Sequence, residues 1–302
     1  MNQFSISQLS QFSGIKAHTI RIWEQRYKAL QPYRSEGNTR YYDGKQLRRL
    51  LNIVSLTEAG YKISKLGAME DEQLFSLIAK LEEKERGSEL NEVYISQLIA
   101  AAMDFNEVHF EKTFSHCLLK YGIKEAYLLV IYPMLKRVGL LWASNTIPPA
   151  REHFISNIIK QKLYTAIDAL PPEGNKDESW LLFLPENEFH EIGLLFANYM
   201  IRSSGRKVLY LGANLPFQSL AGAVEQVSPS KLLMFLVHYD LPETVQQYVN
   251  DLESVFPEQQ IYISGNKKLL GQLEVRKNIH KLGSVADLEK ELELMVDNEA
   301  IY

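Results

Sequence analysis

The chain has 302 residues, 46% of them hydrophobic and 23% charged, which is typical of a globular protein of two or three domains. Its single cysteine, Cys117, excludes an internal disulfide and any multi-cysteine metal site. No apolar run reaches the roughly 18 residues that a membrane span needs, and the N-terminus lacks the pattern of a secretion signal. We therefore expect a cytoplasmic protein with no membrane partner.

Charge is distributed unevenly along the chain. Residues 1–69 hold 11 Lys and Arg against 4 Asp and Glu, whereas the remaining residues hold 22 against 33. A basic head on an acidic body is expected when only one part of a protein contacts a polyanion. Charge alone does not distinguish DNA from RNA or from a membrane surface.

The head begins with two predicted short helices. Ser5 or Ser7 can cap the first helix, and Gly14 stands where a tight turn would end it. A second helix is predicted over residues 16–29, with Ile20 facing inward and Arg21 outward. Two short helices joined by a turn that contains glycine indicate a helix-turn-helix, whose second helix enters the major groove.

A wing and a third helix are expected next. Residues 32–42 place the Gly37-Asn38 turn between short aromatic and basic arms, which favours a β-hairpin. Residues 44–59 then form a predicted basic helix that carries Lys45, Arg48 and Arg49.

Two segments of the head, residues 19–27 (TIRIWEQRY) and 37–42 (GNTRYY), resemble the winged helix-turn-helix of the MerR family of regulators. The resemblance implies a DNA-binding domain over residues 1–75 that contacts double-stranded DNA. The alternative is a small helical domain in which these arginines lie on the surface and the aromatic residues form the core, without any DNA contact. The DNA-binding interpretation is chemically reasonable, because arginine pairs with phosphate or guanine through two hydrogen bonds. The DNA-contacting residues that the resemblance implies are Thr19, Arg21, Arg26, Tyr27, Arg40 and Tyr41.

The middle of the chain is predicted to be helical. Residues 70–90 form a polar helix that leads into a hinge at Gly87-Ser88. From residue 90 to about residue 170, apolar residues recur at three- and four-residue steps, which predicts a four-helix bundle.

One stretch of the bundle is unusual. Trp142 closes a predicted helix, a Pro-Pro pair follows, and Glu152-His153 starts the next helix. A glutamate is favoured early in a helix by the helix dipole, so a packed tryptophan and an N-terminal glutamate would explain these residues without any ligand.

The last third alternates strands with helices after a polar linker at residues 170–179. Strands are predicted at residues 180–184, 207–212, 231–237, 260–264 and 279–282, with helices between them. This pattern predicts a flavodoxin-like, Rossmann-like α/β domain with a five-stranded parallel sheet. The fold class is thus multidomain: a winged helix-turn-helix, a four-helix bundle and an α/β domain.

The loop after the first of these strands carries a histidine. His190 lies between Glu188 and Gly193, at the carboxyl end of the strand and just before a helix. Ligands of such sheets bind at the carboxyl ends, imidazole suits a transition metal, and a nearby carboxylate can set its tautomer. An ordinary loop histidine among solvated glutamates is the alternative.

Taken together, Trp142 with Glu152-His153 and the motif from Glu188 to Gly193 resemble the cobalamin-binding module of the CarH/CarA (LitR) group of MerR-type light-responsive repressors. The resemblance implies a helical cap over residues 90–170 and a Rossmann-like B12-binding domain over residues 178–302. It also implies His190 as the lower cobalt ligand, Glu188 as the residue that adjusts it, and Gly193 as a further cofactor-binding residue of the same loop. The cofactor that it implies is adenosylcobalamin or methylcobalamin. Trp142, Glu152 and His153 would line the upper pocket.

Three positions depart from the family pattern. No serine lies near the end of the third strand, where the family accepts the dimethylbenzimidazole tail. Ser264-Gly265 stands where a Gly-Gly pair lets the tail approach the backbone, so these two residues are the expected tail contacts. Ala143 follows Trp142, where photoswitching members have a histidine.

Three functions are compatible with these features. The first is a regulator, and specifically a repressor, whose dimer or tetramer state on a palindromic operator is set by cobalamin. The second has the same architecture but responds to another ligand or a protein partner. The third, a corrinoid-dependent enzyme, is disfavoured by the fused DNA-binding head, so we expect a protein that is not an enzyme.

Overall fold

The computed structural model describes residues 3–34, 38–84, 91–143, 149–171, 178–237, 242–276 and 278–299. The chain divides into two compact units, residues 1–158 and 159–302. No helix in the described segments is both long and apolar enough to span a membrane. The predicted hinge at Gly87-Ser88 lies outside the described residues.

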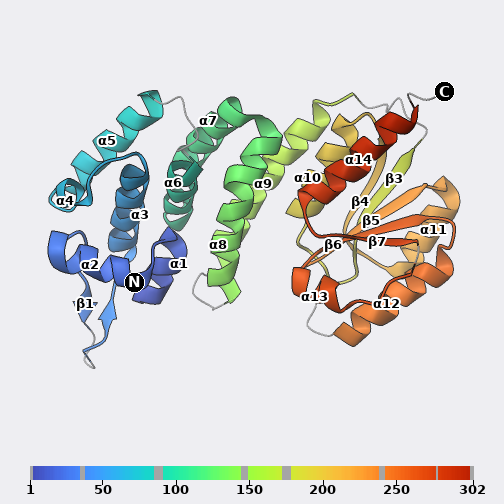
Figure 1. The fold of residues 1–302 in the computed structure, drawn as a ribbon, viewed down its shortest axis with the longest axis horizontal. Coiled ribbons are helices and arrows are strands. Elements are labelled where there is room, and N and C mark those ends of the chain that lie inside the picture. Colours follow the sequence, from blue (N-terminus) through green and yellow to red (C-terminus); the bar gives the residue numbers. More distant parts are fainter. Residues whose placement is uncertain are drawn as a thin grey trace. The chain divides into compact units, whose positions relative to one another are not determined.

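The first unit is helical apart from a small hairpin (Figure 1). Its elements are α1 (Ile6–Ser13), α2 (Ala17–Tyr27), β1 (Tyr33–Arg34), β2 (Arg40–Tyr41), α3 (Gly44–Glu58), α4 (Ile63–Leu66), α5 (Asp71–Lys84), α6 (Asn91–Met103), α7 (Glu107–Ala126), the π-helical η2 (Tyr127–Ile131), α8 (Tyr132–Ala143) and the first half of α9 (Pro149–Asp168).

Local sequence determines where the head helices begin and end. Ser5 caps α1 through a capping box with Gln8, and Gly14 ends it with a φ of 72°. Helix α2 ends at Tyr27, two residues before the predicted end, because Lys28 adopts a left-handed φ of 51° and its N–H bonds back to Trp23. The predicted wing is confirmed as an antiparallel pair in which Tyr33 faces Tyr41.

Helix α3 connects the head to the bundle. It packs extensively on α6, and a polar network lies inside their buried interface. The Gln97 amide donates to Asn52 Oδ1 at 3.2 Å and to Ser55 Oγ at 3.3 Å, and Gln97 Oε1 lies 3.2 Å from His109 Nε2. Buried polar groups need partners of this kind, so the network fixes one register between head and bundle.

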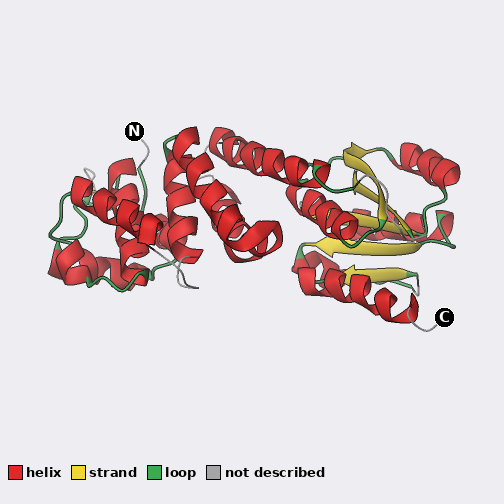
Figure 2. Cartoon of the chain, turned by 90° about the horizontal axis from the view of Figure 1, so that it is seen from above, coloured by secondary structure: helices red, strands yellow, loops and turns green. Residues whose placement is uncertain are grey.

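The second unit is a parallel sheet with helices on both faces (Figures 1 and 2). After the end of α9 its elements are β3 (Ser179–Pro185), α10 (Ile192–Ser203), β4 (Lys207–Leu215), α11 (Phe217–Val227), β5 (Lys231–Leu236), α12 (Pro242–Val255), β6 (Gln260–Gly265), α13 (Lys267–Gln272), β7 (Ile279–Leu282) and α14 (Val285–Glu299).

The strand order is β4-β3-β5-β6-β7, with every pair parallel. This is the predicted flavodoxin-like order, and its switch point lies between β3 and β5, where such folds bind ligands. Strand β4 extends to Leu215, three residues beyond the predicted end, after register shifts against β3.

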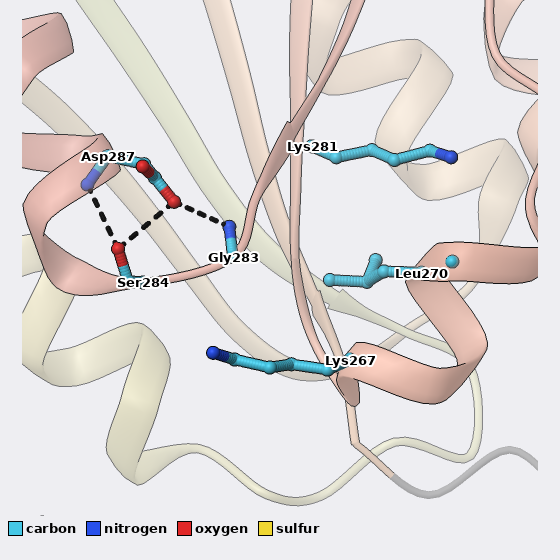
Figure 3. Close-up of a pocket in the computed structure, with 7 residues that line it drawn as sticks. Lys267, Leu270, Lys281, Gly283, Ser284 and Asp287 are labelled. Carbon is cyan, nitrogen blue, oxygen red and sulfur yellow. Dashed lines mark hydrogen bonds between the residues drawn. The ribbon is translucent and has the colours of Figure 1, made fainter.

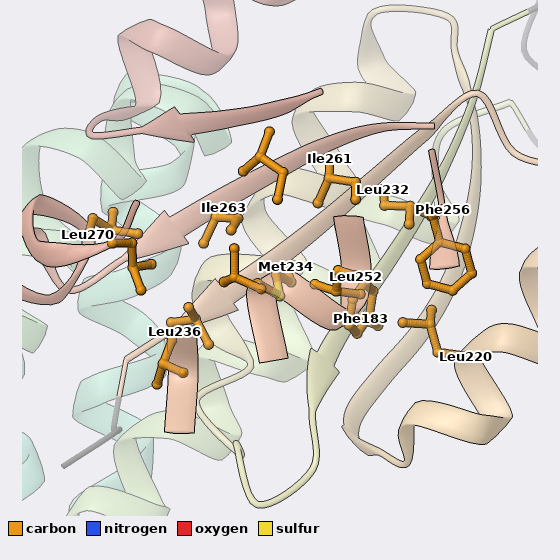
Figure 4. Packing of buried hydrophobic residues seen from close by; sticks show 14 of the residues in the cluster. Phe183, Leu220, Leu232, Met234, Leu236, Leu252, Phe256, Ile261, Ile263 and Leu270 are labelled. Carbon is orange, nitrogen blue, oxygen red and sulfur yellow. The ribbon is translucent and has the colours of Figure 1, made fainter. Parts of the chain in front are cut away.

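The core under one face is formed by apolar residues of the sheet and of helices α11, α12 and α13 (Figure 4). Phe183, Met234 and Ile263 from three neighbouring strands point into it and are completely buried. Because alternate residues of a strand face opposite sides, Leu182 and Leu233 point to the other face, where α10 packs. Continuous apolar strands of this kind are typical of a sheet that is covered on both faces.

A buried ionic cluster lies at the amino ends of the strands. Lys231, which opens β5, donates from Nζ to Glu178 at 2.6 Å and to Glu291 of α14 at 2.8 Å. Arg206 also donates to Glu178, and its side chain is completely buried. The cluster therefore ties α14 and the starts of three strands together at the edge opposite the ligand-binding end of the sheet.

Candidate functional site

The predicted DNA-contacting residues lie on two elements of the head. Thr19, Arg21, Arg26 and Tyr27 are on α2, where Arg21 and Arg26 are exposed and Thr19 and Tyr27 half-buried. The guanidinium of Arg26 lies over the ring of Tyr27, 5.8 Å from its centroid. Helix α2 thus exposes two arginine side chains, and one of them, that of Arg26, packs over the ring of Tyr27.

The other two predicted residues are on strand β2 of the wing. Arg40 forms an ion pair of 3.3 Å with Glu24 of α2, and Glu24 also accepts a hydrogen bond of 2.7 Å from Tyr42. The ring of Tyr41 stacks on Tyr33, with centroids 5.5 Å apart. The Arg40–Glu24 ion pair holds the wing against α2.

The basic helix α3 contributes less to this surface than its sequence indicates. The guanidinium of Arg49 donates to the carbonyl oxygens of Ala29 at 2.8 Å and Met69 at 2.7 Å, and it pairs with Asp71 at 2.6 Å. Arg48 pairs with Asp104, which follows α6. Arg49 is therefore a structural residue of the head, and Arg48 joins the head to the bundle.

In the second unit, Glu188 and His190 are brought together at the carboxyl end of β3. Nδ1 of His190 lies 2.6 Å from Oε1 of Glu188, and the same oxygen accepts the N–H of Phe189 at 2.9 Å. The other oxygen accepts the N–H of Val237, just after β5, at 2.9 Å. The Glu188 carboxylate, which is completely buried, therefore spans the switch point between β3 and β5.

This arrangement defines the chemistry of the histidine. Both oxygens of the Glu188 side chain accept backbone N–H groups, and Oε1 also takes a hydrogen bond from Nδ1–H of the ring. The neutral tautomer carries its lone pair on Nε2, which is the form that binds a transition metal. Because the side chain of His190 is 43% exposed, its ring can reach a ligand outside the sheet.

Close packing also constrains two glycines near the carboxyl ends of the strands. A Cβ atom on Gly193, in the first turn of α10, would lie 2.8 Å from the Phe235 ring. A Cβ atom on Gly265 would lie 2.1 Å from the carbonyl oxygen of Leu236, at a φ of 131°. Both positions need glycine because neighbouring strands approach them closely. Ser264, beside Gly265, is half-buried and donates its hydroxyl to Leu282 O at 3.0 Å.

Sequence reasoning missed the residues that support the loop from β4 and α9. Asn187 N–H donates to Asn214 Oδ1 at 2.9 Å, and both residues have a positive φ. Glu191 Oε1 accepts hydrogen bonds from Tyr210 at 2.9 Å and from Tyr164 at 3.4 Å. Only the two asparagines carried a sequence signal, because asparagine tolerates left-handed backbone conformations.

The predicted upper-pocket residues belong to the bundle. Glu152 is in the first turn of α9, and His153 Nδ1 lies 3.2 Å from its carboxylate, with the histidine side chain 71% exposed. Trp142 is in the last turn of α8, but its side chain lies outside the described residues.

A separate cavity of about 380 Å³ lies at the β6–β7 side of the sheet (Figure 3). Its polar groups serve the local structure: Asp287 accepts from the N–H of Gly283 at 2.9 Å and from the hydroxyl of Ser284 at 3.0 Å, and Lys281 donates to Leu273 O. In the strand order, β5 separates β6 from β3, so this cavity is not part of the His190 loop. The candidate site is the loop.

Comparison with known families finds two matches in this chain. Residues 4–73 match the family described as MerR HTH family regulatory protein, and residues 94–166 match the family described as B12 binding domain. The second match supports cobalamin as the cofactor.

Two curated proteins of Myxococcus xanthus are similar over most of their length. The HTH-type transcriptional repressor CarH is 26% identical over 84% of this chain and 85% of its own length. The HTH-type transcriptional repressor CarA is 28% identical over 92% of this chain and 91% of its own length.

Among solved structures, the monomethylamine corrinoid protein of Methanosarcina barkeri superposes with a TM-score of 0.54 at 14% identity. The match covers 68% of this chain and 99% of that protein, and it shows the fold alone. The chain thus carries a MerR-type helix-turn-helix domain and a B12 binding domain, and it is a homologue of the CarH and CarA transcriptional repressors.

Proposed function

We propose that this transcriptional regulator acts as a repressor and binds adenosylcobalamin or methylcobalamin through His190, and that the bound cofactor controls its oligomerisation and its affinity for DNA. The observation that carries the proposal is the 2.6 Å pair of His190 Nδ1 with the buried Glu188 carboxylate. A metal-binding imidazole needs such a partner to present the lone pair of Nε2.

The residues present fit a cobalamin. When bound, the cofactor would supply a cobalt centre that accepts a nitrogen ligand. His190 would be that ligand, and Glu188 would hold its tautomer, while Ser264 and Gly265 would lie beside the nucleotide tail. On the other side of the cofactor, Trp142, Glu152 and His153 would shield the upper face from water.

The head would act on a palindromic operator as part of a dimer or tetramer. Arg21, Arg26 and Arg40 would neutralise phosphates or contact bases, with Thr19, Tyr27 and Tyr41 adding hydroxyl and apolar contacts. A ligand shifts DNA affinity only by its differential affinity for the assemblies that bind DNA, so control requires that cobalamin favour one assembly.

The test uses the full chain with hydroxocobalamin and adenosylcobalamin. The purified protein is mixed with each cofactor, desalted, and examined for retained corrinoid by its absorption spectrum. We expect stoichiometric retention, with an absorption spectrum that differs from that of the free cofactor, and we expect this difference to be lost in His190→Ala. The matched control His18→Ala removes an exposed histidine of α2 and should retain both the cofactor and the spectrum.

The second part of the test measures assembly and DNA binding with and without cofactor, by light scattering and by electrophoretic mobility on DNA from upstream of its own gene. The proposal is supported if addition of the cofactor changes both the assembly state and the affinity for DNA. Retention of cofactor without any change in assembly or DNA affinity would contradict the control mechanism.

A second candidate is a regulator of the same architecture that responds to another ligand or a protein partner. The observation that favours it is Ser264, whose hydroxyl donates to Leu282 O at 3.0 Å, at a position where the resemblance implies a glycine. Failure to retain any corrinoid in the same experiment would favour this candidate over the first.

A further inference from the structure

Glu191, the residue after His190, is bonded to two elements besides its own loop. Its side chain is 16% exposed and lies at the start of α10. From the sheet, the hydroxyl of Tyr210 on β4 donates to Oε1 at 2.9 Å. From α9, the hydroxyl of Tyr164 donates to the same oxygen at 3.4 Å, and Lys160 Nζ lies 3.9 Å from Oε2.

The hydroxyl groups of Tyr210 and Tyr164 are suited to donate hydrogen bonds to Glu191. Burial raises the pKa of Tyr210, and the Glu191 carboxylate raises it further. Burial and then the same carboxylate raise the pKa of Tyr164. Both phenols therefore keep their protons at neutral pH and donate hydrogen bonds to Glu191.

The two α9 residues are placed at a defined spacing from the proposed upper-pocket histidine. Lys160 is seven residues and Tyr164 eleven residues after His153 on one continuous helix. At 3.6 residues per turn these spacings place each of them within roughly 20° of His153 around the helix axis. The side of α9 that contacts Glu191 is thus the side that carries His153, about two to three turns toward the N-terminus.

We infer that Glu191 is a positioning residue that ties the His190 loop to the C-terminal half of α9, so that a ligand on His190 also orders that half of the helix. The inference rests on the proposed function, since it takes cobalamin as the ligand of His190. The hydrogen bond from Tyr210 fixes the Glu191 carboxylate relative to the sheet. The hydrogen bond from Tyr164 then links this carboxylate to α9.

The test measures hydrogen exchange of the backbone amides of residues 159–168 in the full chain, first without cofactor. Tyr164→Phe removes the bond to Glu191 and leaves the His190 loop itself intact. We expect exchange in this segment to become about fivefold faster, since a lost hydrogen bond lowers the cost of local opening. Thr165→Val is the matched control, because its hydroxyl bonds only within α9, to Gln161 O at 2.9 Å.

The same measurement is then made with saturating hydroxocobalamin. In the wild type we expect the cofactor to slow exchange of residues 159–168 by about fivefold or more. In Tyr164→Phe the absorption spectrum of the bound cofactor should remain as in the wild type, while this slowing is lost. Tyr210→Phe and Glu191→Ala should also alter the absorption spectrum of the bound cofactor, because both variants loosen the loop that holds His190. Glu191→Gln keeps an acceptor oxygen and should therefore have the wild-type spectrum.

The outcomes separate the two proposals. A wild type that retains no hydroxocobalamin overturns the proposed function, and the cofactor-free comparison still decides whether the tie exists. A wild type that binds cofactor while Tyr164→Phe shows the same slowing overturns the role of the tie. Equal exchange in Tyr164→Phe and Thr165→Val without cofactor overturns the tie itself.

Discussion

Oε1 of Glu188 lies 2.6 Å from Nδ1 of His190, and the side chain of Glu188 is completely buried. Its oxygens also accept N–H groups of Phe189, His190 and Val237. Burying a carboxylate is unfavourable unless its lone pairs are satisfied, so the loop is built around this group. The position of the His190 imidazole follows from the hydrogen bonds that fix this carboxylate.

Replacing this carboxylate by an amide should weaken the site. In Glu188→Gln the amide NH₂ must face a donor, because both oxygens of the native side chain accept hydrogen bonds. We expect hydroxocobalamin affinity to fall about 10- to 100-fold, as for other groups that orient a metal-binding histidine. Titration followed by absorption measures the affinity, and Glu186→Gln, an exposed position in the same loop, is the control. Equal affinity in both variants would contradict this role of Glu188.

Gly193 should be essential for packing rather than for chemistry. In Gly193→Ala the new methyl group would lie 2.8 Å from the Phe235 ring, so the loop or the ring must move. We expect the free energy of unfolding to fall by about 1–3 kcal/mol, measured by urea denaturation. Gly222→Ala is the control, since nothing lies within 4 Å of its added Cβ in helix α11. That variant should be neutral or more stable by up to about 1 kcal/mol. Similar losses in both variants would show that the Phe235 contact is not the cause.

Much of the fold was predictable from local patterns in the sequence. The apolar strands, the helices between them and the glycine after α1 are properties of short segments, and the parallel order follows from their alternation. The Glu188–His190 pair was also predictable, because two residues of spacing in a loop after a strand keep both side chains at one edge of the sheet.

Contacts between distant segments were not predictable in this way. Arg49 looks like its neighbours Lys45 and Arg48 in sequence, yet its guanidinium bonds to Ala29, Met69 and Asp71. Tyr164 and Glu191 are 27 residues apart, and no periodicity relates a helix to the loop after the next strand. The partners of a charged or phenolic side chain depend on how distant segments pack together, and a local stretch of sequence does not specify this packing.

This difference between arginines has a measurable consequence for DNA binding. Arg21→Ala removes an exposed cation of α2, so it should reduce the slope of log K against log salt by about one on random-sequence duplex DNA. Thermal stability should be unchanged. Arg49→Ala should leave the salt slope as it is but destabilise the head by about 2 kcal/mol, because several partly buried acceptors lose their donor. Fluorescence anisotropy and thermal unfolding distinguish the two variants. A lower salt slope in Arg49→Ala, or a loss of thermal stability in Arg21→Ala, would contradict this division of roles.

The buried cluster at the amino ends of the strands should make the stability of the second unit depend on pH. Burial of Glu178 would raise its pKa, but hydrogen bonds and charges from Lys231 and Arg206 outweigh burial, so its pKa lies below the ordinary value. The unfolded chain then binds a proton at higher pH than the folded chain. The stabilisation is present above the ordinary carboxyl pKa of about 4.3, and it is lost as the pH falls through the lower folded value.

Glu178→Gln tests this dependence. At pH 7 the variant leaves Lys231 and Arg206 buried without this partner, so we expect a loss of about 3 kcal/mol in the free energy of unfolding. The difference from the wild type should shrink as the pH falls below about 4, because the wild-type carboxylate is then being protonated as well. Urea denaturation at pH 7 and at about pH 3 measures both values, and Glu225→Gln on the exposed side of α11 is the control. A loss of the same size at both pH values would mean that Glu178 stabilises the cluster by its shape and not by its charge.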